Sequence, residues 1–598
     1  MHILCKRIYP DVIKFYLYVF EVCKQNLTKK YFDILYESAI IFPFATSGCI
    51  GECMTLAEKI THLRIVNNIS QEQLADQLGV TRQSVSKWES GESMPQIDKV
   101  LELCELFKIT ADELINDSIV IHRGKKLPMS IGEDIKTKYF GTDGFRGEVN
   151  KTLTADHAYK IGRFLGWFYG NPKFNSQKPG YRPKVVIGKD TRRSSYMLEY
   201  AVAAGLAASG ADVSLLHVTT TPSVSYIVRQ DCFDCGVMIT ASHNPFYDNG
   251  IKVINANGEK LEDAVAFLAE AYIDGDLKKL EVEGNDLPFA ERGNIGSITD
   301  YSSGRNRYIA YLISLAKHSM KSLKIGLDAA NGASWMIAKS VFDALGAQTF
   351  VINNNPDGLN INLDAGSTHI EKFCKYVKDN NLDLGFAFDG DADRCIAVDE
   401  NGKEVDGDKI MYLLSCKLKE EGALEKNTLV TTIMSNSGLT KALKAIGVSN
   451  VQTKVGDRFV FERMQSDGYS LGGEQSGHVI IKKYATTGDG VLTAIMVTEQ
   501  VLEKKEKLSK LVAPVKLLPQ ITRNVRVTNK AAVVADEEVQ AKFNEVNKEI
   551  GDDGRALLRQ SGTEPVVRIM IELDSKEKCE EYITRIYNVI KKRGYVCE

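Results

Sequence analysis

The 598-residue sequence lacks three features that would assign it to whole classes of protein. It has no run of roughly 18 apolar residues, the length that a membrane-spanning helix needs. Its formal net charge is only −3, so no global basic field attracts nucleic acid, and DNA binding would need a local basic face. Its 12 cysteines follow no regular framework, which suits a reducing cytoplasm better than a disulfide scaffold.

One pair of cysteines still needs an interpretation. Cys232 and Cys235 form a C-x-x-C, but no second pair at zinc spacing accompanies them. We therefore favour two ordinary thiols before a buried strand over a metal or redox site.

Four regions follow one another along the chain. Residues 1–53 are rich in Tyr, Phe, Ile and Cys without a clean period, and they hold four of the twelve cysteines. We expect this foreign stretch to be no part of the working protein, with translation starting at Met54. Residues 54–117 predict a compact helical domain, residues 118–137 a polar linker, and residues 138–598 a series of α/β domains.

The helical segment has the pattern of two helices joined by a short turn. Ser70 and Gln73 form a capping box that opens the first helix. Gly79 breaks the chain, and Thr81 can cap a second helix over residues 82–88. This is the helix-turn-helix arrangement.

Candidate DNA contacts lie on both helices. The second helix would present Gln83, Ser84 and Lys87 outward, and Gln71 is a further candidate on the first. Trp88 is better explained as a packing residue. The segment resembles the repressor-like helix-turn-helix family, which implies DNA binding by a dimer; the alternative is a helical bundle kept for protein contacts.

Strand and helix patterns alternate after residue 138. Residues 185–187 form a buried-strand run, residues 196–209 are helical, and residues 213–216 begin the next strand. Such βαβ units place ligand-binding loops at the carboxyl ends of the strands.

The first two loops with chemical potential carry a phosphate-binding cation and a nucleophile. Residues 138–147 supply three glycines and the guanidinium of Arg146. Ser242 follows an apolar run, and Lys252 adds an amine suited to phosphate. An acyl nucleophile is disfavoured, because the G-x-S-x-G elbow is missing around Ser242; alone, Ser242 could simply cap a turn.

The third loop carries alternate carboxylates. Asp389, Asp391 and Asp393 would point to one side of an extended loop and could bind a hard cation such as Mg²⁺. An EF-hand fails here, because Arg394 stands where glycine is needed and strands flank the loop. An acidic surface turn is the plain alternative.

The last two loops offer groups for sugar hydroxyls and for phosphate. Residues 472–478 alternate Glu474, Ser476 and His478, which can exchange hydrogen bonds with a sugar. Residues 559–568 combine two arginines, two hydroxyls and a glycine, which can cradle a phosphate.

Together the five loops resemble the α-D-phosphohexomutase superfamily over roughly residues 138–598. The resemblance implies Mg²⁺ as cofactor, a hexose phosphate as substrate, and four domains around a central cleft. We expect three α/β domains and a smaller α+β C-terminal domain, preceded by the all-α helix-turn-helix domain. The expected bounds of the four are 138–302, 303–402, 403–516 and 517–598.

The resemblance also implies roles for single residues. The phosphoryl group would be carried by Ser242, assisted by Arg146, His243 and Lys252. The cation would be bound by Ser242, Asp389, Asp391 and Asp393. The substrate would be held by Arg394, Glu474, Ser476, His478, Arg559, Ser561, Gly562, Thr563 and Arg568.

Within the superfamily, residues 473–478 are most similar to the phosphoglucosamine mutases of bacteria. Other subfamilies more often carry Met at the position of Gln475. Ala392 and Gln560 depart from common family residues, but neither removes a ligand. We expect a cytoplasmic enzyme for glucosamine phosphates, with a homodimer as the candidate assembly. Mannose or glucose phosphate specificity, and a sugar-phosphate-sensing transcriptional regulator, are the alternatives.

Overall fold

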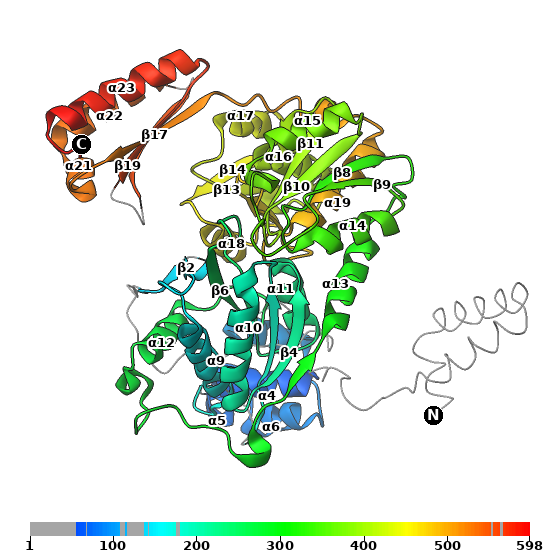
Figure 1. Ribbon diagram of the computed structural model, residues 1–598. Helices are drawn as coiled ribbons and strands as arrows, with labels where there is room; N and C mark the ends of the chain where they lie inside the picture. Colours follow the sequence, from blue (N-terminus) through cyan, green and yellow to red (C-terminus); the bar gives the residue numbers. More distant parts are fainter. Residues whose placement is uncertain are drawn as a thin grey trace, which may run out of the picture. The chain divides into compact units, whose positions relative to one another are not determined.

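A computed structural model describes residues 55–66, 69–107, 114–115, 137–141, 143–174, 180–551, 554–561 and 566–597. The described chain falls into a helical part before residue 122 and a larger body after it, and each is described by itself (Figure 1). The predicted extension 1–53 and nearly all of the predicted linker 118–137 lie outside the described residues. Among the described helices, none combines the length and apolar character needed to cross a membrane.

The helical part contains the two capped helices that the sequence predicts. Its helices are α4 (Leu56–Val66), α5 (Gln71–Gln77), α6 (Arg82–Ser90) and α7 (Ile97–Phe107). Ser70 and Gln73 form the capping box of α5, and the side chain of Thr81 accepts a hydrogen bond from the N–H group of Ser84 at the start of α6. Gly79 lies between them with φ +61°, a conformation that favours glycine. Trp88 is buried in the core, as expected.

The body is built on four β-sheets, and we call the parts of the chain around them domains 1 to 4. Domain 1 has a seven-stranded sheet of order β1-β2-β6-β5-β3-β4-β7. Its strands are β1 (Phe140–Gly141), β2 (Gly144–Glu148), β3 (Lys184–Lys189), β4 (Asp212–Val218), β5 (Cys235–Ile239), β6 (Asp248–Asn255) and β7 (Ile298–Asp300). Its helices are α9 (Ala155–Gly170), α10 (Arg193–Ala208), α11 (Thr221–Gln230) and α12 (Asp263–Ile273), with short turns η1 (Leu277–Leu280) and η2 (Arg292–Asn294).

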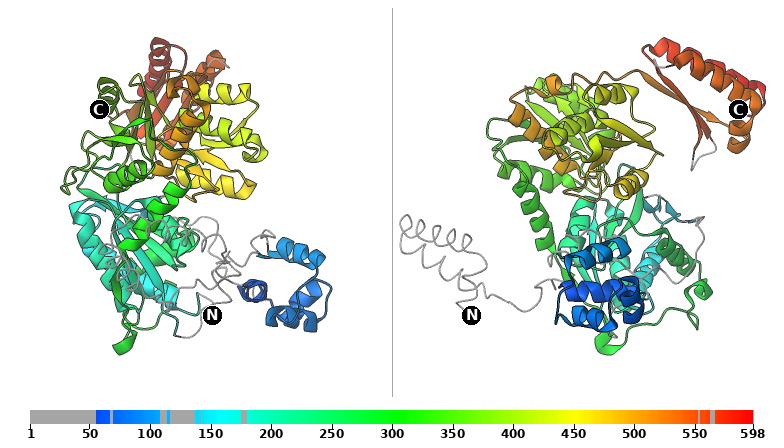
Figure 2. Two further views of the ribbon diagram at one scale, coloured as in Figure 1. Left: turned by 90° about the vertical axis from the view of Figure 1, so that its right-hand side faces the viewer. Right: turned by 180° about the vertical axis from the view of Figure 1, so that it is seen from behind.

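Burial on both faces explains the apolar runs of this sheet. Helices α9, α10 and α12 share one core with the sheet, and α11 forms another with its opposite face (Figure 2). Strand β3 runs parallel to β4 and to β5, so their carboxyl ends lie at one edge. The predicted helix and strands of the βαβ unit are confirmed as α10, β3 and β4.

Domain 2 carries the acidic loop on a hairpin. Its sheet has the order β12-β11-β10-β8-β9, and β10 pairs antiparallel with β11. The strands are β8 (Lys324–Asp328), β9 (Gln348–Ile352), β10 (Leu384–Phe388), β11 (Cys395–Asp399) and β12 (Glu404–Val405). The helices are α13 (Ser302–Ser314), α14 (Ser334–Ala344), α15 (Glu371–Asp379) and the short η3 (Gly366–Thr368).

Domain 3 has a four-stranded sheet of order β14-β13-β15-β16. Its strands are β13 (Thr428–Thr432), β14 (Ser449–Thr453), β15 (Leu471–Gly473) and β16 (Val479–Ile481). Its helices are α16 (Gly407–Glu420), η4 (Glu425–Asn427), α17 (Ser437–Ala445), α18 (Asp457–Asp467), α19 (Gly490–Lys504) and α20 (Leu508–Leu511).

Domain 4 is the smallest of the four. Its strands β17 (Gln520–Arg526), β18 (Arg555–Gln560) and β19 (Val566–Glu572) form a sheet of order β17-β19-β18. Helices α21 (Lys530–Ala535), α22 (Glu537–Ile550) and α23 (Lys576–Lys592) pack on the sheet around one core of Val and Ile side chains (Figure 1). The predicted class, three α/β domains and a smaller α+β domain after a helical domain, is confirmed, while the bounds given above stay predictions.

Candidate active site

Ser242 lies in a tightly held loop after β5. Its φ is +53°, an uncommon conformation for a residue with a side chain, and the side chain is buried. The backbone N–H of Ser242 donates to Thr240 Oγ1 at 2.9 Å. Its carbonyl accepts from Arg192 Nη2 and from Asn362 Nδ2, both at 2.8 Å. Such backbone strain persists only where the surroundings fix it, and it marks Ser242 as a candidate functional residue.

The residues that hold this loop are ones that the sequence did not single out. Arg192 is fully buried and pairs with Asp190 at 2.8 Å. Both follow β3, whose carboxyl end lies at the same edge as that of β5. The position after a buried parallel strand was the available sign of their importance.

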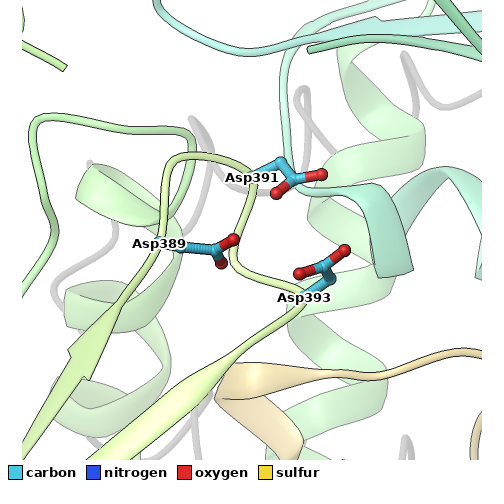
Figure 3. Close-up of side chains that lie close together, drawn as sticks. All are labelled: Asp389, Asp391 and Asp393. Carbon is cyan, nitrogen blue, oxygen red and sulfur yellow. The ribbon is translucent and has the colours of Figure 1, made fainter. Parts of the chain in front are cut away.

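The acidic loop brings its three carboxylates together. Asp389, Asp391 and Asp393 lie between β10 and β11, and one oxygen of each lies within 4.8 Å of the others (Figure 3). Ala392, between two of them, has φ +56°. Ser242 Oγ donates to Asp389 Oδ2 at 2.6 Å, so the nucleophile candidate touches the acidic loop directly.

The charges of the acidic loop suit a bound cation. Burial raises the pKa of Asp389, and the neighbouring charges of Asp393 and Asp391 raise it further. Burial and Asp393 also raise the pKa of Asp391. Asp391 Oδ1 is buried and accepts no hydrogen bond from any residue that the structure describes. A divalent cation would reduce the repulsion among the three carboxylates and would give Asp391 Oδ1 a partner. These residues therefore fit a metal site.

Lys252 connects the acidic loop with the first glycine-rich loop. Its Nζ lies 2.8 Å from Asp391, 3.3 Å from Asp393 and 3.0 Å from Asp143. Burial lowers the pKa of Lys252, but these three carboxylates outweigh it and hold the pKa well above its ordinary value. Lys252 is therefore an ammonium group. Asp143, which also pairs with Arg146, was not among the predicted site residues.

His243 and Arg394 border the same space. The Nδ1 atom of His243 lies 3.3 Å from Ser242 Oγ. Burial and the charges of Arg394 and Arg146 lower the pKa of His243 to about 4, so its ring is neutral at neutral pH. The backbone N–H of Arg394 donates to Asp389 at 3.2 Å.

The predicted sugar loop separates into two kinds of residue. Glu474 is half-buried and its Oε1 accepts from the backbone N–H of Gly456 at 3.0 Å, and Ser476 is exposed. His478 is buried instead, and its Nε2 accepts from the backbone N–H of Gly488 at 2.9 Å. The ring of His478 thus already has a partner within the protein.

A cavity of about 430 Å³ adjoins this region. It is lined by Asp143, Lys252 and Lys260 of domain 1, by Asp393 of domain 2 and by Asp457 of domain 3. The charged residues of domains 1, 2 and 3 thus meet around one cavity.

Domain 4 carries two of the predicted phosphate ligands side by side. Arg559 of β18 and Arg568 of β19 are cross-strand partners. Burial lowers the pKa of Arg559, and the charge of Arg568 lowers it further. Ser561 is buried and its carbonyl accepts from Lys530 at 2.7 Å. Gly562 and Thr563 lie outside the described residues.

The strands of domain 4 are anchored to domain 3 at their other end. Arg555 Nη1 donates to the carbonyl of Ile433 at 2.8 Å, and Nη2 pairs with Glu572 at 3.0 Å. Glu572 in turn accepts from the N–H of Ser437 at 2.8 Å. Among the residues that the structure describes, no hydrogen bond or ion pair joins Arg559 or Arg568 to Ser242 or the acidic loop.

The predicted DNA contacts of the helical part differ in exposure and in their hydrogen-bond partners. Gln83 and Lys87 are exposed on α6, and the hydroxyl of Ser84 lies 2.9 Å from that of Thr81. Gln71 Nε2 donates to Glu89 at 2.8 Å, and the Glu89 carboxylate also pairs with Arg64. Gln71 is thus engaged within the helical part itself.

Comparison with protein families agrees with this architecture. The models described as phosphoglucomutase/phosphomannomutase α/β/α domains I, II and III match residues 137–279, 306–402 and 406–517, and the C-terminal domain of that family matches residues 523–589. A helix-turn-helix model matches residues 62–114.

Curated relatives cover the body at high identity. The phosphoglucosamine mutase of Lachnospira eligens is 56% identical over 458 residues, which are 77% of this chain and 99% of the relative. That of Bacillus subtilis is 47% identical over 455 residues, which are 76% and 98%. The chain therefore belongs to the phosphoglucomutase/phosphomannomutase family of phosphohexomutases, and it is an isomerase that moves a phosphoryl group.

Solved structures share the fold at lower identity. A phosphoglucomutase/phosphomannomutase family protein of Burkholderia thailandensis superposes with a TM-score of 0.62 at 24% identity, covering 76% of this chain and 97% of that one. A phosphomannomutase homologue of Thermus thermophilus gives 0.60 at 21% identity, covering 76% and 98%.

Proposed function

We propose that the enzyme interconverts glucosamine 6-phosphate and glucosamine 1-phosphate through a phosphoserine at Ser242. The observation that carries the mechanism is the 2.6 Å contact between Ser242 Oγ and Asp389 within a buried acidic loop. Curated relatives that are 47%, 56% and 57% identical over the body are phosphoglucosamine mutases, which supports the amino sugar as substrate.

The reaction consists of two phosphoryl transfers in opposite directions. In the first, the bond between phosphorus and Ser242 Oγ breaks while the free hydroxyl of the sugar monophosphate forms a new one. The proton of that hydroxyl leaves, and Ser242 Oγ gains one, giving a sugar bisphosphate. After the bisphosphate turns over, Ser242 accepts the phosphoryl group from the other position.

The protein's own groups meet the needs of these steps. Lys252, an ammonium group, can donate a hydrogen bond or a proton to the serine oxygen as it leaves. Arg146 supplies positive charge beside the transferring group. The neutral ring of His243 next to Ser242 Oγ can exchange a proton with it.

We propose Mg²⁺ as the cation of the acidic loop, because three carboxylates offer only hard oxygen donors. Asp389, Asp391 and Asp393 would hold it, together with the oxygen of Ser242. A cation bound there would neutralise negative charge on the transferring phosphoryl group.

The remaining predicted residues would hold the substrate. Glu474 and Ser476 are the candidates for the sugar hydroxyls, together with the buried His478, and Arg394, whose backbone N–H donates to Asp389, would also contact the substrate. Arg559 and Arg568, with Ser561, Gly562 and Thr563, would bind whichever phosphate is not being transferred. The scatter of the cysteines along the sequence, without a regular framework, supports a cytoplasmic location.

A panel of substrates tests the proposal. Purified enzyme, primed with a hexose 1,6-bisphosphate and Mg²⁺, should convert glucosamine 1-phosphate at least about tenfold more efficiently than the mannose or glucose analogues, measured as kcat/KM. A preference for the mannose or glucose compound would contradict the amino-sugar specificity while leaving the phosphoserine chemistry intact.

We further propose that the helical part binds DNA, as a dimer. The capped pair of helices α5 and α6, with Gln83 and Lys87 exposed on the second, supports this. Because Gln71 is held by Glu89, we expect its contribution to be smaller than that of Gln83 or Lys87.

Gel shifts of the full chain against a genomic fragment library test DNA binding. We expect a salt-sensitive, sequence-selective complex that Lys87→Ala weakens and that the control Lys99→Ala, at a half-buried lysine of α7 paired with Glu102, leaves unchanged. No selective complex at micromolar protein would instead favour a protein-interaction module.

A further inference from the structure

The V-G-D-R sequence at residues 455–458 has no role in the chemistry described so far. Asp457 is the first residue of α18 in domain 3. Its carboxylate pairs with Lys260 of domain 1, with Nζ–O distances of 2.7 and 2.8 Å. Lys260 lies close after β6, the strand that carries Lys252.

Lys260 joins two carboxylates from different domains. Its Nζ also lies 2.9 Å from Asp143 Oδ1, while Asp143 Oδ2 lies 3.0 Å from Lys252. Lys252 in turn reaches Asp393 of the acidic loop. Asp393, Lys252, Asp143, Lys260 and Asp457 thus form a continuous line of alternating charges, which we call the charge chain.

The two ends of the charge chain lie at the acidic loop and at the sugar loop, residues 472–478. At one end, Asp393 belongs to the acidic loop. At the other, Gly456, which immediately precedes Asp457, donates its backbone N–H to Glu474 of the sugar loop. The φ of Gly456 is +128°, which only glycine adopts readily, so this donor position depends on the residue type.

The ring of His478 lies near both ends of the charge chain. Its Nδ1 is 3.7 Å from Asp393 and its Nε2 is 3.5 Å from Asp457. All five residues of the charge chain line the cavity described above, and His478 of the sugar loop lies close to the two carboxylates at its ends.

We propose that Lys260 is a positioning residue that fixes the sugar loop of domain 3 in register with the acidic loop of domain 2. Its ammonium group balances Asp143 and Asp457 at once. Without it, Asp143 would draw Lys252 away from the acidic loop, and Asp457, which would lose its ammonium partner and keep the His478 ring, would shift together with Gly456 and Glu474. The inference rests on the proposed mutase function and names a residue of the same site.

The chain offers a matched control for domain cohesion. Arg458 also joins domains 1 and 3, through Nη1 and Nη2 at 2.5 and 2.8 Å from Asp263, but it lies outside the charge chain. Lys260→Met and Arg458→Met therefore each remove one ion pair between the same two domains, and only the first touches the charge chain.

Two measurements on the full-length enzyme test the proposal. The first is steady-state turnover of the hexose 1-phosphate that the wild type uses best. Lys260→Met should lower kcat at least about tenfold and raise KM about threefold or more, whereas Arg458→Met should change both less than about threefold. The unfolding midpoints of the two variants, measured in parallel, identify a folding defect.

The second measurement is the rate at which hexose 1,6-bisphosphate and Mg²⁺ phosphorylate Ser242, followed by intact mass and peptide mapping. Lys260→Met should slow this half-reaction at least about fivefold, and adding Asp457→Asn to it should restore at least threefold, because the carboxylate that lost its ammonium partner is removed. Equal losses in Lys260→Met and Arg458→Met, or no rescue by Asp457→Asn, would overturn the positioning role. A wild type that is never phosphorylated on Ser242 would instead overturn the proposed function itself.

Discussion

The charged groups around Ser242 and those of the arginine pair in domain 4 are arranged in opposite ways. Around Ser242, Lys252 and Arg146 face carboxylates, and Lys252 contacts three of them. In domain 4, Arg559 and Arg568 lie opposite each other on neighbouring strands; burial lowers the pKa of Arg559, and the charge of Arg568 lowers it further. The first region pairs its cations with carboxylates, while the second places two cations next to each other, an arrangement that suits binding of a phosphate dianion.

The two regions also differ in how they are anchored to the rest of the protein. The Ser242 loop is held by Arg192 and Asn362 from two sides. The domain 4 strands are fixed to domain 3 at the end that carries Arg555 and Glu572, and the arginine pair lies toward the other end. We infer that the first region performs the chemistry and that the second grips the substrate, so that variants in the two should fail in different kinetic parameters.

The largest effect is expected in the balanced region. Ser242→Ala should lower kcat at least about a thousandfold, because the covalent carrier of the phosphoryl group is lost. The measurement is mutase turnover at saturating substrate. Ser415→Ala removes another buried hydroxyl, one that only bonds to Met411 within α16, and should retain at least half of the activity. Activity of Ser242→Ala above a tenth of normal would exclude the phosphoserine route.

Neutralising a carboxylate of the acidic loop should have the next largest effect. Asp391→Asn should lower kcat about a hundredfold and raise the Mg²⁺ concentration for half-maximal activity about tenfold, since one anionic ligand is lost. Titration of activity with Mg²⁺ measures both. Asp343→Asn, which alters an exposed carboxylate paired with Lys339, is the control. An unchanged Mg²⁺ titration would mean that the acidic loop does not bind the metal.

The arginine pair should respond in KM. Arg568→Met and Arg559→Met should each raise KM for the sugar phosphate about tenfold, or about 1.4 kcal/mol of binding, with kcat changed less than about threefold. Initial rates over a range of substrate concentrations separate the two parameters. A fall in kcat as large as that of Asp391→Asn would contradict the assignment of catalysis to the first region and of substrate binding to the second.

The smallest effect is expected at Asp408, in the part of domain 3 that is bonded to the segment leading to domain 4. Asp408 accepts from the N–H of Asn436, whose side chain bonds to Leu518 on the way to domain 4. Burial and the charge of Asp406 raise the pKa of Asp408 from 3.8 to about 7. Because the folded state binds this proton more tightly than the unfolded state, the group costs stability as pH rises from about 4 through 7.

Asp408→Asn should therefore gain stability relative to the wild type at high pH. We expect the difference in unfolding free energy to grow by on the order of 1 kcal/mol between pH 5 and pH 8, measured by urea unfolding. A difference that is constant with pH would show that Asp408 does not titrate in this range.

Local patterns allowed much of this architecture to be predicted. The capping box of Ser70 and Gln73, the buried run at β3 and the alternating aspartates depend on neighbours within a few residues, and all three are present as expected. The membership of the family and the helix-turn-helix match also agree with the prediction.

Contacts between distant parts of the chain could not be read in the same way. Lys260 and Asp457 are 197 residues apart, and their pairing depends on how domains 1 and 3 pack. The buried ring of His478 and the engagement of Gln71 with Glu89 likewise follow from tertiary packing, which a local pattern does not encode. Gly562 and Thr563, predicted from the resemblance alone, stay predictions.

The central claim is that the phosphoryl group passes through Ser242. The most direct measurement is to incubate the enzyme briefly with a hexose bisphosphate carrying labelled phosphate, quench it, and map the label by peptide mass spectrometry. We predict label on Ser242, lost again when unlabelled glucosamine 1-phosphate is added, with the label recovered in the sugar product. Label on another residue, or rapid turnover with no label on any residue, would contradict the account.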